Sequence, residues 1–197
     1  MMHILRHMNE LREIIKNYSA FKEESILENF KFIHNGKTGY YESLDLNYGK
    51  RKNLILELYE DYSHDDKALI KVLLAEELKA SKIDSPVYTV DLCAFMLYKH
   101  MEIEDIYQLY EAKFGANTDL QVYVDIELIF GFDKEETKQY LLNKQKDKRK
   151  NKKILEAISY YEQNPNAQFR SRAEYIEHFE TRKIKGIKAD LDEINEN

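Results

Sequence analysis

Two aspartates, 34 residues apart, have the clearest potential for acid–base chemistry. Asp91 is the one charged residue in the mostly apolar range 88–98. A buried carboxylate costs several kcal/mol unless it is paired or protonated, so Asp91 needs a partner inside the fold. The favoured interpretation is a salt bridge between helices or a hydrogen bond to a tyrosine. The alternative is a general acid or base with a raised pKa, grouped with Asp125, Glu127 or His100.

Other catalytic or ligand-binding patterns are weak. Cys93 is the only cysteine. It lies inside an apolar helix without a cation nearby, so we interpret it as a core residue rather than a nucleophile. The triplet 36–38 (Gly-Lys-Thr) ends like a phosphate-binding loop, but Lys31 replaces the earlier glycine and a helix precedes it, which excludes that motif. We find no hydrolase, zinc or dinucleotide motif, and we expect no catalytic residue, metal or cofactor.

The range 34–50 is the longest predicted loop, because it holds three glycines and three tyrosines without helical periodicity. The chain contains 15 tyrosines, a residue type enriched at protein interfaces. Tyr40, Tyr41 and Tyr48 are therefore candidates for binding a partner. The favoured alternative is that these tyrosines pack the loop onto its own domain.

A basic run at 144–153 is the strongest local charge signal, since only Asp147 opposes its lysines and arginine. The candidate anion-binding residues are Lys148, Arg149, Lys150 and Lys152. No aromatic residue or glycine interrupts the run to form a stacking surface for bases. A solvated helix end or connector is the favoured interpretation.

Composition limits the classes of partner. The net charge is -6 and the pI is about 5.6, so the average field repels nucleic acids and anionic membranes. The first residues lack the continuous apolar stretch of a signal peptide, and no apolar run is long enough to span a bilayer. We expect a cytoplasmic protein whose partner is another protein, with no membrane contact; a homo-oligomer is left open.

Helices are predicted throughout, because only 6 glycines and 2 prolines interrupt apolar residues at helical spacing. The candidate caps at helix starts are Ser63, Ser85, Thr118, Asp133 and Ser171. Gly115 and Gly131 are expected to end helices, Gly115 in a left-handed conformation. The predicted helices cover 2–33 (as one or two), 51–62, 65–82, 86–100, 103–114, 119–130, 134–142, 154–161 and 171–179. For 119–130 a strand remains an alternative, since its apolar residues also alternate.

Helix starts near 86, 103, 118 and 134 indicate a hairpin that recurs about every 32 to 34 residues, as in helical solenoids. The sequence thus predicts an all-α fold of antiparallel hairpins stacked as a repeat-like, solenoid-like bundle of about eight or nine helices. We expect a single domain over 1–197, with the glycine- and tyrosine-rich loop at 34–50, a basic connector at 144–153 and a frayed acidic tail at 189–197.

Several residues between 111 and 141 follow a recognisable pattern. They are Glu111, Ala112, Lys113, Asn117, Asp119, Asp125, Gly131, Glu136, Thr137, Tyr140 and Leu141. The pattern resembles a segment of an uncharacterised family of all-helical bacterial proteins, in which EAK is followed by N and D, by D-x-x-L-x-x-G and by a short helix ending in Y-L. The chain departs from it at 114–116 and 120–122. The resemblance implies a bacterial helical protein and carries no activity.

The functional expectation is a helical domain that binds another protein and has no catalytic activity. A toxin-neutralising immunity protein is one alternative, based on composition. An enzyme with an acidic site between helices near Asp91 and Asp125 is another. Nucleic-acid binding through 144–153 is the weakest hypothesis.

Overall fold

The fold consists of helices, as the sequence predicts. The computed structural model describes residues 2–39, 43–83 and 87–196, with side chains from residue 8 to 191 inside these ranges. Eleven α-helices lie in this part of the chain, joined by short 3₁₀ turns. They are α1 Met2–Phe21, α2 Tyr48–Glu60, α3 Lys67–Ala80, α4 Val87–Lys99, α5 Ile106–Phe114, α6 Thr118–Tyr123, α7 Glu127–Phe130, α8 Lys134–Asn143, α9 Lys148–Glu162, α10 Arg172–His178 and α11 Ile184–Glu196.

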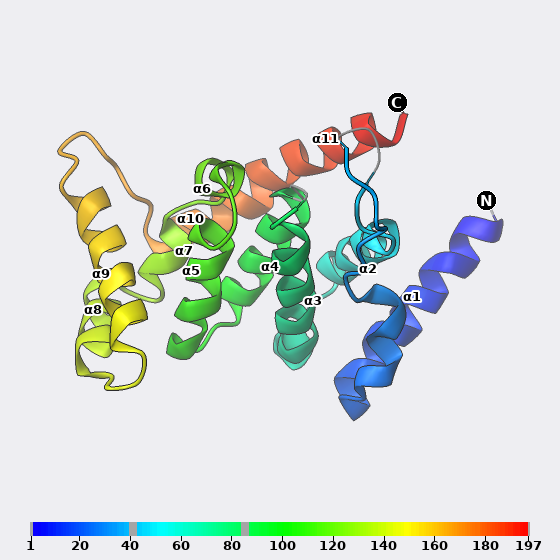
Figure 1. The fold of residues 1–197 in the computed structure, drawn as a ribbon, viewed down its shortest axis with the longest axis horizontal. Coiled ribbons are helices and arrows are strands. Elements are labelled where there is room, and N and C mark those ends of the chain that lie inside the picture. Colours follow the sequence, from blue (N-terminus) through cyan, green and yellow to red (C-terminus); the bar gives the residue numbers. More distant parts are fainter. Residues whose placement is uncertain (1, 40–42, 84–86, 197) are drawn as a thin grey trace.

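Consecutive helices pair and stack along the long axis of the molecule (Figure 1). The pairs are α1 with α2, α3 with α4, α5 with α6 and α7, and α8 with α9. Contacts from α1 to α3 and from α3 to α5 form one layer, and contacts from α2 to α4 and from α4 to α6 and α7 form the other. This arrangement confirms the predicted stack of hairpins.

The C-terminal helical segment crosses the stack instead of adding another hairpin (Figure 1). It comprises α10, a π-helical turn η4 (Phe179–Lys183) and α11 without interruption. Phe179 stacks on Phe95 of α4 with ring centroids 3.8 Å apart, and Lys188 pairs with Glu60 of α2. The segment therefore packs against the layer that contains α2 and α4.

The core consists of two apolar clusters. The larger one joins α1 to α7 with α10 and α11, and it includes Phe95 and Phe179. The smaller one lies beneath α8 and α9 around Ile154 and Ile158. Helix α5 contributes to both, through Leu109 and Ile106 respectively. The predicted single-domain organisation stays a prediction.

Three of the predicted caps are confirmed. Ser63 and Ser171 form reciprocal capping boxes with Asp66 and Glu174. The Asp133 side chain accepts hydrogen bonds from two amides of the first turn of α8. These side chains satisfy amides that a helix start leaves without a partner. The fourth candidate, Ser85, lies outside the described residues.

The predicted cap at Thr118 is wrong. Asn117 is the N-cap of α6, and its side-chain oxygen accepts a hydrogen bond from the Leu120 amide at 3.0 Å. Its amide nitrogen also donates to the Ser81 carbonyl at 3.0 Å, which ties α6 to the end of α3. The cap therefore lies one residue before the predicted position, at a residue that also makes a tertiary contact.

We expect Asn117→Ala to lower the free energy of unfolding by about 1–2 kcal/mol, because it removes a cap and a second hydrogen bond. Thr118→Ala, the matched control, should change it by less than about 0.5 kcal/mol, since Thr118 is exposed. Urea unfolding followed by circular dichroism measures both. An equal loss of unfolding free energy in the two variants would contradict the assignment of Asn117 as the cap and favour Thr118.

The segment 119–130 is helical but broken. Val124 has an extended backbone conformation, which separates α6 from α7. Gly131 has φ of +70° and ends α7, as expected for a glycine at a helix end. The left-handed conformation predicted for Gly115 is wrong: its φ is -79°, and its amide closes a normal helical hydrogen bond to Glu111.

Helices also extend into three segments that the sequence predicts to be irregular or frayed. Helix α2 begins at Tyr48, inside the predicted loop 34–50. Helix α9 begins at Lys148, with the Asp147 side chain accepting from the Lys150 amide, so the connector is shorter than 144–153. Helix α11 runs to Glu196.

A buried arginine fixes the segment before α2. Arg51 is fully buried, and its Nε donates to Glu77 Oε1 at 2.5 Å, while NH2 donates to Asp45 Oδ2 at 2.6 Å and NH1 to the Phe30 carbonyl at 3.2 Å. Thr89 donates to the second Glu77 oxygen. The guanidinium group of Arg51 in α2 therefore joins Phe30, the segment before α2 and helix α3.

Candidate functional site

The two aspartates singled out by the sequence meet in the fold, at a lysine that the sequence did not indicate. Lys183 Nζ lies 2.8 Å from Asp91 Oδ2 and 2.6 Å from Asp125 Oδ2. The Asp91 side chain is fully buried, whereas that of Asp125 is 29% exposed and that of Lys183 15%. Asp91 comes from α4, Asp125 from the turn before α7, and Lys183 from the end of η4. We call these three residues the carboxylate clamp.

Further hydrogen bonds hold the clamp in place. Lys183 Nζ also donates to the Tyr123 carbonyl at 2.9 Å. The Tyr175 hydroxyl donates to Asp125 Oδ2 at 3.2 Å. Neither oxygen of Asp91 accepts a hydrogen bond of good geometry from the described residues, in spite of the short distance to Lys183. Asp91 is thus held by charge rather than by directed hydrogen bonds.

Burial controls the protonation of Asp91. Removal from water raises its pKa to about 7, and the nearby Asp125 carboxylate adds to this rise, although Lys183 opposes it. The same carboxylates raise the pKa of Lys183 above its ordinary value and more than offset its burial. A raised pKa is the property that a general acid or base would have, but structural ion pairs produce it too.

Lys183 lies between the two carboxylates of the clamp. Neither Asp91 nor Asp125 is a lining residue of the pocket beside α10, of the two depressions along α3 or of the pocket between α5, α8 and α9. Of the other proposed members, Glu127 accepts from the main chain and guanidinium of Arg170, at 3.3 and 3.2 Å. His100, which follows the end of α4, packs instead against Tyr62.

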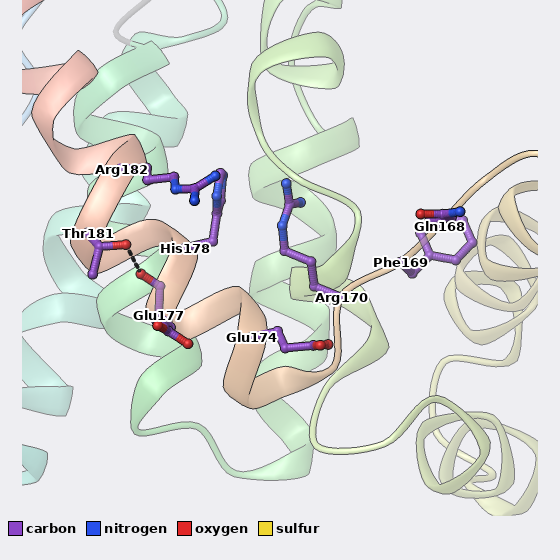
Figure 2. A pocket seen from close by; sticks show the side chains of 8 residues that line it. All are labelled: Gln168, Phe169, Arg170, Glu174, Glu177, His178, Thr181 and Arg182. Atoms are coloured by element: carbon purple, nitrogen blue, oxygen red, sulfur yellow. Dashed lines mark hydrogen bonds between the residues drawn. The ribbon is translucent and has the colours of Figure 1, made fainter.

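An open pocket lies beside the clamp, on the outer side of α10 and η4 (Figure 2). It has a volume of about 500 Å³. In Figure 2, Arg170 stands on one side and His178 and Arg182 on the other, while the Glu174 and Glu177 carboxylates lie toward the opposite end. The other lining residues are Gln168, Phe169 and Thr181.

A groove crosses the layer formed by α1, α3 and α5. One depression, of about 450 Å³, lies between η1 (Glu24–Phe30) and α3, and a second, of about 270 Å³, lies between α3 and α5. They share the lining residues Ala75, Lys79 and Gln108, so they adjoin each other. We call them together the α3 groove. Its apolar lining residues are Leu27, Val72, Ala75 and Leu78, and its lysines are Lys31, Lys71, Lys79 and Lys82.

The tyrosines mostly pack within the protein. Among the tyrosines that the structure describes, only Tyr160 is mostly exposed, at 73%. Pairs such as Tyr98 with Tyr175 join neighbouring helices edge to face. Tyr40 and Tyr41 lie outside the described residues, and Tyr48 is half-buried at the start of α2. Their part in partner binding stays a prediction.

The basic candidates do not converge on one point. Lys150 pairs with Glu111 at 2.8 Å, and Lys152 lies 3.7 Å from Glu156. Lys148 and Arg149 are exposed on the first turn of α9. Anion binding by these four residues stays a prediction without a pocket of its own: of the four, only Lys150 lines a pocket in the described part of the chain. Cys93 is fully buried, and burial raises its pKa, which favours the core interpretation.

Sequence reasoning missed Lys183 and Arg51, the two cations at the centre of the buried polar contacts. Lys183 occurs among other charged residues of the C-terminal segment and Arg51 between two lysines, so neither has a distinguishing pattern. The one available signal was indirect: an acid in an apolar helix needs a cation somewhere in the chain. Pairing over such distances along the chain follows only from the fold.

No described helix has both the length and the apolar character needed to cross a bilayer. The described residues also contain no group of three or more histidine, cysteine and acidic side chains that could hold a metal ion. Comparison of the chain with models of protein families, with curated proteins and with solved structures finds no match, so any function has to be inferred from the residues and geometry described above.

Proposed function

We propose that this chain is a helical scaffold that binds another protein along the α3 groove. The observation that carries the proposal is that two depressions adjoin across α3, with apolar side chains along both. Stacked helical hairpins present extended surfaces, and proteins of this architecture commonly bind partners along them. The opposite layer is covered by α10 and α11.

Charge indicates the chemistry of the partner. The groove is lined by four lysines and three glutamates (Glu24, Glu76 and Glu111), a small excess of positive charge in a chain whose net charge is -6. Lys71 and Lys79 keep part of their side chains exposed although each pairs with an acid, Asp105 and Glu76 respectively. A segment with acidic side chains flanking apolar ones would match both the lysines and the lining. We therefore infer an acidic partner segment.

The acidic enzyme hypothesis has less support, because Lys183 lies between the carboxylates and pairs with both. A toxin-neutralising immunity protein would be one form of the proposed binding function.

Photo-crosslinking in the native cell tests the proposal. A photoreactive amino acid at Lys79, which is 57% exposed, should give one adduct with a single partner protein. The same amino acid at Lys185, exposed on α11, should not. Adducts of equal yield at both positions, or a crosslinked dimer of the chain itself, would contradict the proposal.

Charge reversal gives a second readout on the captured partner. Lys79→Glu with Lys82→Glu should reduce its recovery several-fold and make the remainder insensitive to salt, because the reversed charges repel an acidic segment. The matched control, Lys185→Glu with Lys188→Glu, makes the same charge change on α11 and should leave recovery unaltered. A partner that binds both variants equally does not use the groove.

A further inference from the structure

The pocket beside the carboxylate clamp has cations gathered at one end, and the proposed scaffold function does not use it. Arg170 belongs to the segment that leads into α10, His178 to the last turn of α10, and Arg182 to η4 (Figure 2). The π-helical turn directs Lys183 inward to the clamp, while Arg182 lines the pocket. Such turns within α-helices are frequent at functional sites.

The side-chain donors of Arg182 and His178 are free to bind a ligand. The side chains of Arg182 and His178 have no hydrogen bond or ion pair to any residue that the structure describes. Arg170 is oriented by Glu127, whose Oε1 accepts from its NH1 at 3.2 Å. Glu127 is almost fully buried, so it fixes Arg170 from behind the pocket.

Two carboxylates also line the pocket, and Arg170 interacts with the charge of Glu174 as well as with Glu127. Glu174 caps α10: its Oε2 accepts from the Ser171 amide at 2.8 Å and from the Ser171 hydroxyl at 2.7 Å. Glu177 lies toward the end away from the arginines (Figure 2). The pocket is therefore dipolar, with its basic end formed by Arg170, His178 and Arg182.

We propose that this pocket binds the phosphate group of a small phosphorylated molecule through Arg170, His178 and Arg182. Guanidinium groups match the oxygens of a phosphate, and three donors on two sides suit a tetrahedral anion better than a planar carboxylate. A volume of about 500 Å³ leaves room for more than the phosphate, and Gln168 and Phe169 border that space. The carboxylates at the other end repel a second anionic group there.

The charged residues around His178 agree with a phosphate site. Burial lowers its pKa, and Arg170, Arg182 and Lys183 lower it further, while Asp125 opposes them. The acidic residues that line the pocket, Glu174 and Glu177, face its other end. An anion bound between the cations would reverse part of this shift and raise the pKa of His178.

Titration of the full chain with inorganic phosphate tests the site. The ring signal of His178, assigned by its loss in His178→Gln, is followed by NMR at fixed pH, with chloride holding the ionic strength constant. We expect a saturable shift and a higher pKa of His178 with phosphate, and no saturation with acetate. Arg182→Gln should weaken phosphate binding about tenfold or more, since it removes a charged hydrogen-bonding partner.

Two further variants test the role of the charge at position 182 and provide a control outside the pocket. Arg182→Lys, which retains the charge, should restore part of the affinity, and Lys185→Gln, outside the pocket, should bind like the wild type. A shift that does not saturate, that acetate reproduces, or that persists in Arg182→Gln would overturn the site. The result is independent of the α3 groove, because no residue is shared between the two.

Discussion

Lys183→Met should lower the free energy of unfolding by about 3–5 kcal/mol above about pH 8, because it leaves the fully buried Asp91 without its cation. The loss should be smaller near pH 5. There Asp91 is neutral in the folded state, so removal of Lys183 strands no charge at this position. Urea unfolding at the two pH values measures the difference.

Lys188→Met is the matched control on the same helical segment. Lys188 pairs with Glu60, but both side chains are about half exposed, at 45% and 53%. Exposed pairs contribute at most about 1 kcal/mol, so this variant should be close to the wild type. Asp91→Asn combined with Lys183→Met should lose less than the sum of the single variants. Equal losses in Lys183→Met and Lys188→Met would show that the clamp is not a stabilising contact.

Asp91 also gives the wild type a characteristic pH dependence. Its pKa is about 7 in the fold, above the ordinary 3.8 of an aspartate, so the folded state binds more protons between these two pH values. Stability from this group is therefore fully present below about pH 4 and is lost as the pH rises to about 7. We expect the wild type to lose stability relative to Asp91→Asn over this window, as measured by urea unfolding. A constant difference would contradict the raised pKa.

Arg51→Met should be at least as destabilising, with a loss of about 3–5 kcal/mol, because it strands two carboxylates in the interior. Glu77 is fully buried and Asp45 nearly so. Asp45 also accepts hydrogen bonds from the Ile33 and Asn47 amides, so these amides should exchange with solvent faster in the variant. Urea unfolding and hydrogen exchange measured by NMR test both effects.

Arg12→Met is the control for Arg51→Met, because it removes an arginine whose side chain is exposed. Arg12 is paired with Glu57; its own side chain is 63% exposed and that of Glu57 is 8% exposed, so the variant leaves one partly shielded carboxylate and should lose less than Arg51→Met, about 1–2 kcal/mol. If Arg51→Met were as mild as Arg12→Met, or left exchange of the Ile33 and Asn47 amides unchanged, the network around Arg51 would not hold the segment before α2.

Local sequence determined the helices and most of their ends. Apolar residues at helical spacing act within one segment, and caps such as Ser63, Asp133 and Ser171 act within one turn, so both can be read without a fold. The recurrence of hairpins followed from the spacing of these starts. The need of Asp91 for a partner followed from the composition of its own helix.

Tertiary structure decided the rest, because those features depend on which distant residues meet. The α6 cap Asn117 also reaches Ser81, and η4 placed Lys183 beside Asp91 and Asp125. The α3 groove and the pocket lined by Arg170, His178 and Arg182 are spaces between elements, so no single segment encodes them. Charge and periodicity are properties of a segment, whereas burial, pairing and cavities arise only when segments pack together.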